Sequence, residues 1–211
     1  MTETRDIEFE VEGGDHLRGW LFTPAIAQQR YPAISMAHGY AGVKEHGLKR
    51  FAQAFAEAGF VVLVRDHRNF GASDGTFRHD IDPWRQIADW RRAISFVESQ
   101  PNVDASRIGI WGTSYAGGHV LVLGATDRRI RAVVSQVPTI SGYQQGLRRV
   151  PPDAVEAMER QFNEDERATI SRRGTAAPAG CQRRSLDPGG LSGQRRHRLL
   201  PPTSSGRRLE K

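Results

Sequence analysis

Short apolar runs and longer amphipathic stretches alternate over the first 140 residues. Apolar and polar positions also alternate over 7–11 and 17–22, on either side of Gly13 and Gly14, which is typical of an antiparallel hairpin. The further expected strands are 33–37, 60–64, 107–111 and 130–135, and the expected helices between them are 48–58, 83–99 and 115–125. Strands joined by helices of this length predict an α/β fold with a mostly parallel sheet, helices on both faces and the hairpin at one edge.

This alternation stops after Pro138. Residues 151–168 form one polar, charged stretch of helical character, which we expect to begin a lid. From residue 171 onward the chain has no Val, Ile, Phe, Tyr, Trp or Met, so that segment cannot bury a core. The sequence therefore predicts a core over 1–150, the start of a lid helix over 151–170 and a disordered basic tail over 171–211.

The basic character of the chain is confined to this tail. The full sequence has a net charge of +6 and a pI of about 10.1. Residues 1–170 hold 20 Lys/Arg against 22 Asp/Glu, a net of −2, whereas residues 171–211 hold 10 against 2, a net of +8. Arginine pairs in the tail could contact phosphates, but the tail has no aromatic residue on which bases could stack. We therefore expect no nucleic-acid partner.

Cysteine usage and the N-terminus indicate the compartment. The single cysteine, Cys181, excludes an intramolecular disulfide. The acidic N-terminus lacks the basic start and apolar run of a signal peptide, and no apolar stretch approaches the ~20 residues of a membrane span. These features predict a cytoplasmic protein that does not bind membranes.

The clearest chemical signal is the string GTSYAGG at 112–118, between an expected strand and an expected helix. A serine on a sharp strand-to-helix turn presents its hydroxyl above the sheet edge, and small neighbours allow the turn to close. Here those neighbours are Gly112, Ala116 and Gly117, with Ala116 at a position where the usual pattern has glycine. A plain glycine-rich turn is the alternative, which the flanking strand and helix disfavour. Ser114 is therefore the candidate nucleophile.

A second signal, MAHGYAG at 36–42, follows the expected strand at 33–37. A tetrahedral oxyanion needs two backbone N–H donors, which such sites take from the residue after the nucleophile and from this loop. We assign these donors to Tyr115 and Tyr40. His38 and Gly39 are expected to support the loop rather than to react.

The other acidic and histidine residues do not predict a metal site. The string at 65–75 has neither a Walker-type ending nor the spacing of metal ligands. Further candidate metal ligands are better explained as solvated loop charges or as carboxylates at a helix N-terminus, namely Glu45, His46, His79, Asp80 and Asp82. We expect no metal and no cofactor.

Three stretches carry a resemblance to a known family, namely HGYAGVKEHGL, DHRNFGASDGTFRHDIDPWRQIADW and RIGIWGTSYAGGHVLVLGA. Over residues 5–165 the chain resembles the X-Pro dipeptidyl-peptidase-like, dienelactone-hydrolase-like and polyketide-transferase-like branch of the α/β-hydrolases. The resemblance implies attack of Ser114 on the carbonyl of a small-molecule ester, thioester or amide. In such enzymes a histidine takes the serine proton, an acid orients that histidine, and a lid shapes the pocket.

The resemblance fails for the other two members of the catalytic triad. In this fold the acid follows a seventh strand and the histidine an eighth, and the sequence shows neither strand. The histidines after Ser114 are His119, in the same helix, and His197, in the tail; the acids Asp127, Asp153 and Asp165 lie in a turn or in the lid stretch. We find no triad acid or histidine among them.

Two readings of the whole chain follow. The first is an incomplete α/β-hydrolase fold, C-terminally truncated or frameshifted near residue 168, in a serine hydrolase or acyltransferase family member with little activity of its own. The second is a degenerate, non-catalytic protein with a binding role or none. The sequence leaves the oligomeric state open.

Overall fold

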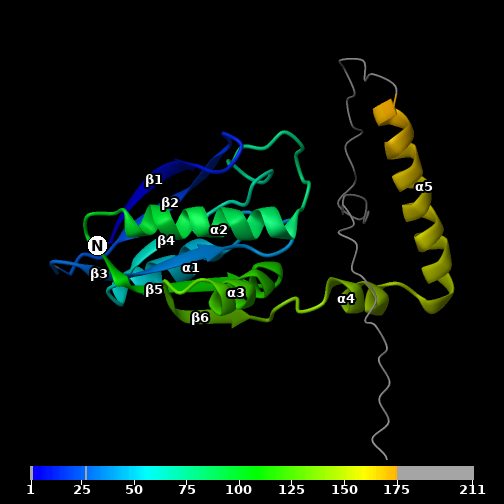
Figure 1. Ribbon diagram of the computed structural model, residues 1–211. Coiled ribbons are helices and arrows are strands. Elements are labelled where there is room, and N and C mark those ends of the chain that lie inside the picture. Colours follow the sequence, from blue (N-terminus) through cyan, green and yellow to red (C-terminus); the bar gives the residue numbers. More distant parts are fainter. Residues whose placement is uncertain (1, 27, 175–211) are drawn as a thin grey trace, which may run out of the picture.

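The computed structural model describes residues 2–26 and 28–174, and its centre is a six-stranded sheet with the order β1-β2-β4-β3-β5-β6 (Figure 1). The first two strands pair antiparallel, β2 also runs antiparallel to β4, and the remaining pairs are parallel. The strands are β1 Glu3–Glu10, β2 His16–Thr23, β3 Tyr31–Ala37, β4 Val61–Arg65, β5 Val103–Thr113 and β6 Ile130–Gln136. The predicted α/β class, with a mostly parallel sheet and an N-terminal hairpin at its edge, is confirmed.

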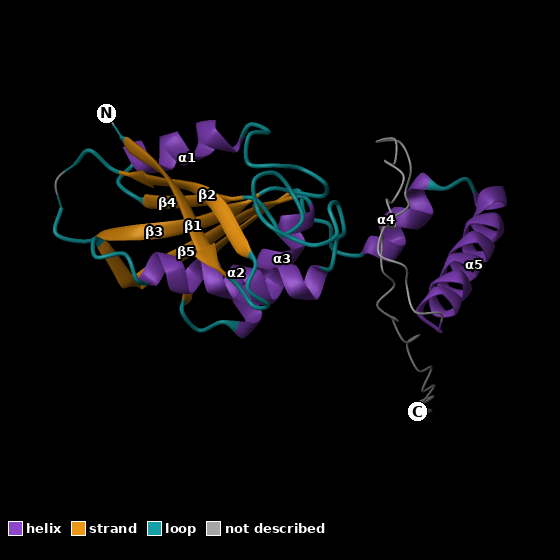
Figure 2. Cartoon of the chain, turned by 90° about the horizontal axis from the view of Figure 1, so that it is seen from above, coloured by secondary structure: helices purple, strands orange, loops and turns teal. Residues whose placement is uncertain are grey.

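Helices cover both faces of this sheet (Figure 2). The first helix, α1, packs on β2 and β4 and buries Leu48, Ala52 and Ala56 on one face. On the other face α2 and α3 share a core with β5 that includes Trp90 and Val120. The helices are α1 Leu48–Glu57, α2 Pro83–Glu98, α3 Tyr115–Thr126, α4 Gly142–Arg149 and α5 Val155–Gly174, and a 3-10 turn spans Pro152–Ala154.

The central strands owe their burial to an unbroken apolar sequence. Every residue of β4 is buried, including Arg65 at its end. Strands that carry helices on both faces bury side chains of both orientations, which explains why Val61–Arg65 does not alternate with polar residues. Because β3, β4 and β5 run parallel, their carboxyl ends lie at the same edge of the sheet, where the loops of the site begin.

The region after β6 differs from the sequence-based expectation. Helix α4 was not predicted, because its eight residues include two glycines and little apolar periodicity; the Ser141 side chain caps it by accepting from Gln144 N. The predicted single helix over 151–168 is a 3-10 turn followed by α5, which continues to Gly174. Figures 1 and 2 show α4 and α5 beyond the carboxyl ends of the parallel strands and apart from the sheet. The lid over 151–170 stays a prediction, and the tail from residue 175 lies outside the described residues.

Candidate active site

Ser114 occupies the turn between β5 and α3, with backbone angles φ 55° and ψ −112°. Few residues other than glycine adopt a positive φ, and such strain persists only where the surroundings fix the backbone. Here the end of β6 fixes it: Ser114 N donates to Gln136 O at 2.9 Å, and Thr139 N donates to Ser114 O at 2.8 Å. The turn is therefore held in the sharp strand-to-helix conformation that exposes a serine side chain.

Small residues around Ser114 make this turn possible. A β-carbon at Gly112 would lie 2.3 Å from Ala116 O, and one at Gly117 would lie 3.0 Å from the Pro138 α-carbon. Ala116 itself is fully buried, so its methyl group fits where the usual pattern has glycine. Gly112 and Gly117, two of the three positions singled out from the sequence, are thus positions where the backbone passes close to its neighbours.

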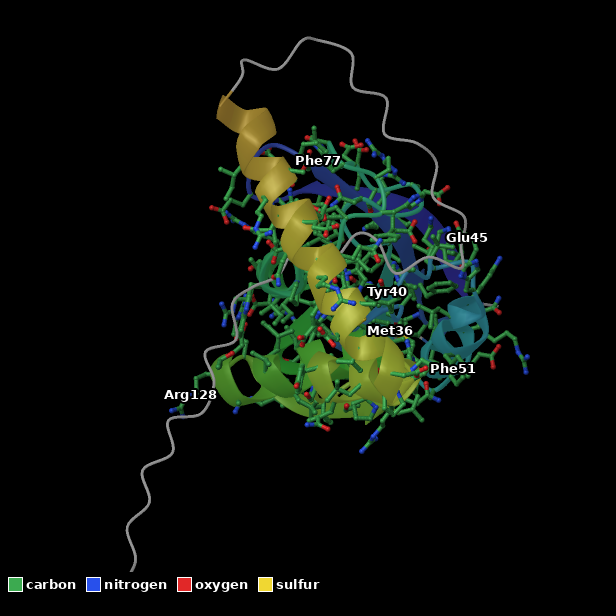
Figure 3. All side chains as sticks on the ribbon, turned by 90° about the vertical axis from the view of Figure 1, so that its right-hand side faces the viewer. Met36, Tyr40, Glu45, Phe51, Phe77 and Arg128 are labelled. Atoms are coloured by element: carbon green, nitrogen blue, oxygen red, sulfur yellow. The ribbon has the colours of Figure 1, made fainter. Side chains whose placement is uncertain are left out.

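The loop after β3 lies directly against this turn. A β-carbon at Gly39 would lie 2.8 Å from the Ser114 β-carbon, and the Tyr40 and Tyr115 rings meet edge to face at 5.7 Å. Figure 3, which views the molecule from the side of α4 and α5, labels Tyr40 beside Met36 of β3. Tyr115 opens α3, and the first N–H groups of a helix have no partner within the helix. The fold therefore brings together both residues assigned as oxyanion donors.

His38 uses both ring nitrogens to hold backbone. Nδ1 donates to Gly39 O at 2.9 Å, and Nε2 accepts from His67 N at 3.0 Å. This pattern requires a neutral ring, and burial lowers the pKa of His38 to about 4. The side chain fastens the loop to the residue that follows Asp66 and does not contact the Ser114 hydroxyl among the described hydrogen bonds.

The sequence matches a known protein family over most of its length. Residues 13–180 match the family described as X-Pro dipeptidyl-peptidase (S15 family), and this range includes the loop after β3 and the turn at Ser114. The chain belongs to this family. The predicted resemblance is therefore confirmed.

Curated relatives of this S15-family chain include a thiohydrolase, a polyketide transferase and a quorum-quenching protein. Thiohydrolase aneE of Aspergillus aculeatus is 37% identical over 135 residues, covering 64% of this chain and 42% of that protein. Polyketide transferase grgF of a Penicillium species is 36% identical over 146 residues, covering 69% and 49%. The quorum-quenching protein AidA of Acinetobacter baumannii is 40% identical over 127 residues, covering 60% and 42%. The chain spans about half the length of these relatives.

Solved structures with a similar fold support this assignment to the family. A hypothetical protein, PA2218 of Pseudomonas aeruginosa, has a TM-score of 0.71 at 29% identity, covering 84% of this chain and 56% of that one. The α/β hydrolase GrgF of Penicillium sp. sh18 has a TM-score of 0.69 at 31% identity, covering 83% and 57%. The S15-family chain thus has the α/β-hydrolase fold over its described part.

His119 lies inside the S15-family core. The centroid of its ring lies 4.9 Å from that of Tyr115 and 5.6 Å from that of His67. Neither ring nitrogen has a hydrogen-bond partner among residues 2–26 and 28–174. Burial, together with the charges of Arg65 and His38, lowers the pKa of His119 to about 3. A buried, neutral ring without a link to Ser114 is a poor candidate for the base that takes a serine proton.

The candidate acids are also remote from this role. Asp127 Oδ2 forms an ion pair with Arg129 Nη2 at 2.7 Å. Asp153 and Asp165 are exposed in the segments after α4. In the part of the chain that the structure describes, no histidine is hydrogen-bonded to the Ser114 hydroxyl. His197 lies outside the described residues.

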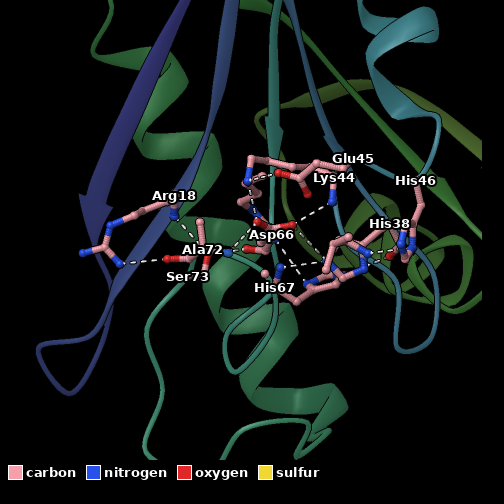
Figure 4. Close-up of polar contacts among 12 residues, drawn as sticks. Arg18, His38, Lys44, Glu45, His46, Asp66, His67, Ala72 and Ser73 are labelled. Atoms are coloured by element: carbon pink, nitrogen blue, oxygen red, sulfur yellow. Dashed lines mark hydrogen bonds and ion pairs between the residues drawn. The ribbon is translucent and has the colours of Figure 1, made fainter. Parts of the chain in front are cut away.

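Sequence reasoning missed a buried ionic cluster beside the loop (Figure 4). Asp66 follows β4, is fully buried, and accepts hydrogen bonds from Lys44 N, Lys44 Nζ and Ala72 N. The signal was available in principle, because a lysine in a glycine-rich loop and an aspartate at a strand end are both close in sequence to His38 or His67. Their pairing spans 22 residues, so only the fold reveals it.

Within the described ranges, no group of three His, Cys, Asp or Glu side chains is arranged to hold a metal ion, and no helix there is long and apolar enough to cross a bilayer. A cavity of about 190 Å³ opens between the loop after β4 and the start of α2, with Asn69, Phe77 and Gln86 in its wall. Ser114 is not part of that wall, so we do not assign the acyl pocket to this cavity.

Proposed function

We propose that this chain carries the nucleophile of a serine hydrolase or acyltransferase that forms an acyl-enzyme at Ser114. The observation that carries the proposal is the strained backbone of Ser114, held between β5 and α3 with the Gly39 loop against it. A glycine-rich turn without a chemical role would not need a serine at the one position with positive φ.

The proposed chemistry begins with attack of Ser114 Oγ on the carbonyl carbon of an ester, thioester or amide. The Tyr40 and Tyr115 N–H groups donate to the oxyanion of the tetrahedral intermediate. A general base takes the Ser114 proton and passes it to the departing alcohol, thiol or amine. Water or an acceptor alcohol or amine then attacks the acyl-enzyme and releases Ser114. No metal or cofactor takes part in these steps.

The substrate class rests on the relatives' names. One is a thiohydrolase and another a polyketide transferase, which supports an activated acyl group such as a thioester as the substrate. Hydrolysis and transfer share the same acyl-enzyme and differ only in the molecule that discharges it. The lack of a base linked to Ser114 within residues 2–174 supports slow turnover for this chain alone. Triad-deficient serine hydrolases retain about 1000- to 10,000-fold catalysis over water.

Covalent labelling tests the proposal directly. The 211-residue chain is treated with a fluorophosphonate, and the modified residue is located by peptide mass spectrometry. Slow, single-site labelling at Ser114 is expected, with loss of labelling in Ser114→Ala. Full labelling is expected in the control Ser106→Ala, whose serine lies at an exposed position of β5. A folded chain that shows no labelling at Ser114 would overturn the proposal and favour the non-catalytic alternative.

A further inference from the structure

The loop that links β3 to α1 is held at its start by His67 and at its end by the carboxylate of Asp66, two adjacent residues. Near its start, His38 Nε2 accepts from the backbone N–H of His67 at 3.0 Å. Near its end, Lys44 donates its backbone N–H to Oδ1 and its Nζ to Oδ2, each at 2.7 Å. Figure 4 shows both anchors, His38 and Lys44, near Asp66. Gly39, which packs against Ser114, and Tyr40 lie between the two anchors in the chain.

Asp66 is itself fixed by its surroundings. Its backbone N–H donates to Arg18 O in β2 at 3.0 Å, and its carbonyl accepts from the Ser73 hydroxyl at 2.9 Å. A β-carbon at Gly71 would lie 2.2 Å from Asp66 Oδ2, so only glycine at this position leaves room for the carboxylate. The loop is therefore tied to a rigid point of the sheet.

Lys44 is an uncommon side chain for such a loop, because it is 5% exposed and charged. Burial lowers the pKa of Lys44, but the hydrogen bonds to Asp66 and Glu45 raise it by more, so the net shift is upward. The ammonium also lies 5.1 Å from the centre of the Trp20 ring. A buried charge of this kind carries a desolvation penalty, which only well-placed partners of opposite charge offset.

We propose that Lys44 and Asp66 act as a positioning pair that holds the Gly39–Tyr40 backbone in place to receive the oxyanion formed at Ser114. The proposal rests on the proposed function for its chemistry, but its structural part stands apart from it. Removal of the Lys44 ammonium would break one of the two hydrogen bonds that hold the end of the loop and leave Asp66 buried without its cation, while His38 would still hold the start.

Hydrogen exchange tests the structural part without any reaction at Ser114. In Lys44→Met, the amides of residues 39–47 are expected to exchange at least about tenfold faster, since a hydrogen bond to a charged group is lost. Lys44→Arg is expected to restore most of the protection. The matched control is Lys49→Met, whose ammonium lies 5.9 Å from the same Trp20 ring but which is exposed. Unchanged protection in a folded Lys44→Met protein would overturn the proposal.

The rate of fluorophosphonate labelling tests the chemical part, because the phosphonyl oxygen occupies the place of the oxyanion. We expect labelling of Lys44→Met to be about 100-fold slower than wild type, as for a small misplacement of a reacting group. Lys49→Met should label at the wild-type rate. If the wild type is not labelled at all, the proposed function fails, while the hydrogen-exchange result still decides whether the pair positions the loop.

A milder variant covers the case in which Lys44→Met does not fold. Lys44→Gln keeps a donor for Asp66 in a similar volume and should give exchange and labelling rates between those of wild type and Lys44→Met. Equal rates for Lys44→Gln and wild type would overturn the proposal, because the buried positive charge would then have no effect on the loop.

Discussion

Gly39 and Ser114 lie so close together that a β-carbon on Gly39 would stand 2.8 Å from the Ser114 β-carbon and 3.3 Å from its Oγ. The two residues belong to loops that follow different strands, β3 and β5, which are neighbours in the sheet. Their contact means that the conformation of the loop and that of the turn at Ser114 depend on each other. Only glycine leaves room for the serine hydroxyl in its present position.

A methyl group at this contact should displace one of the two loops. For Gly39→Ala we expect a loss of stability of about 1–3 kcal/mol, as for overpacking in a filled site, and labelling of Ser114 slowed roughly 100-fold. The control in the same loop is Gly42→Ala, whose added β-carbon would make an ordinary contact of 3.4 Å with His38. Fluorophosphonate labelling with urea denaturation checks both effects. Wild-type labelling in Gly39→Ala would contradict the tight contact.

The sequence predicted the sheet and the turn at Ser114 because residues that are adjacent in the sequence determine both features. An apolar run such as Val61–Val64 is decisive on its own, and the string around Ser114 is decisive between a strand and a helix. The Lys44–Asp66 pair could not be predicted, because it joins residues that only the β3–β4 register brings together. The burial of His119 was also inaccessible, since it depends on how α3 packs over the residues that follow β4. The role of Ser114 stays a prediction until it is labelled.

Acid should destabilise the protein through its buried histidines. Burial lowers the pKa of His38 to about 4 and of His119 to about 3, and it lowers the pKa of His67 well below its ordinary value. In the unfolded chain these groups titrate near 6.5. As the pH falls from about 6.5 toward 4.5, these histidines therefore bind protons in the unfolded state but not in the folded state. Each such histidine lowers the free energy of unfolding by up to about 1.4 kcal/mol per pH unit. Urea denaturation at several pH values measures this slope.

One variant isolates the contribution of His119. Since neither ring nitrogen has a hydrogen-bond partner in the described part of the chain, His119→Leu should be at least as stable as wild type at pH 8. Its stability relative to wild type should increase toward pH 4.5. Without His119, unfolding takes up one proton fewer, so the free energy of unfolding falls less steeply, by about 1.4 kcal/mol per pH unit. His46→Gln, at an exposed position, serves as the control. An unchanged slope in His119→Leu would show that this ring is protonated in the folded state.

A second buried ion pair should dominate the stability of the loop after β4. Arg68 donates to both Asp89 oxygens, at 3.1 and 2.7 Å, and the two side chains are almost fully buried. Arg68→Met leaves the Asp89 charge without its partner, so we expect a loss of about 3–5 kcal/mol in urea denaturation. The exposed pair of Arg107 and Asp104 is the control, where Arg107→Met should cost at most about 1 kcal/mol.

The double variant Arg68→Met/Asp89→Leu separates pairing from packing. Replacing both members of a buried ion pair with apolar residues is often neutral, so the double variant should recover much of the stability lost in Arg68→Met. A double variant no more stable than Arg68→Met would instead mean that the contacts of Arg68 with Asp15 and Glu12 O carry most of its effect.

Self-association should occur through the edge strand β6, which ends the strand order and pairs with β5. Its apolar residues Val133 and Val134 are 38% and 49% exposed, and an apolar edge with free backbone groups pairs readily with another strand. Lysine blunts such edges, so Val134→Lys should raise the dissociation constant of self-association about tenfold or more in sedimentation velocity. Val137 is 75% exposed but lies just beyond β6, and Val137→Lys is the control. If both variants weaken association equally, exposed apolar surface and not strand pairing drives it.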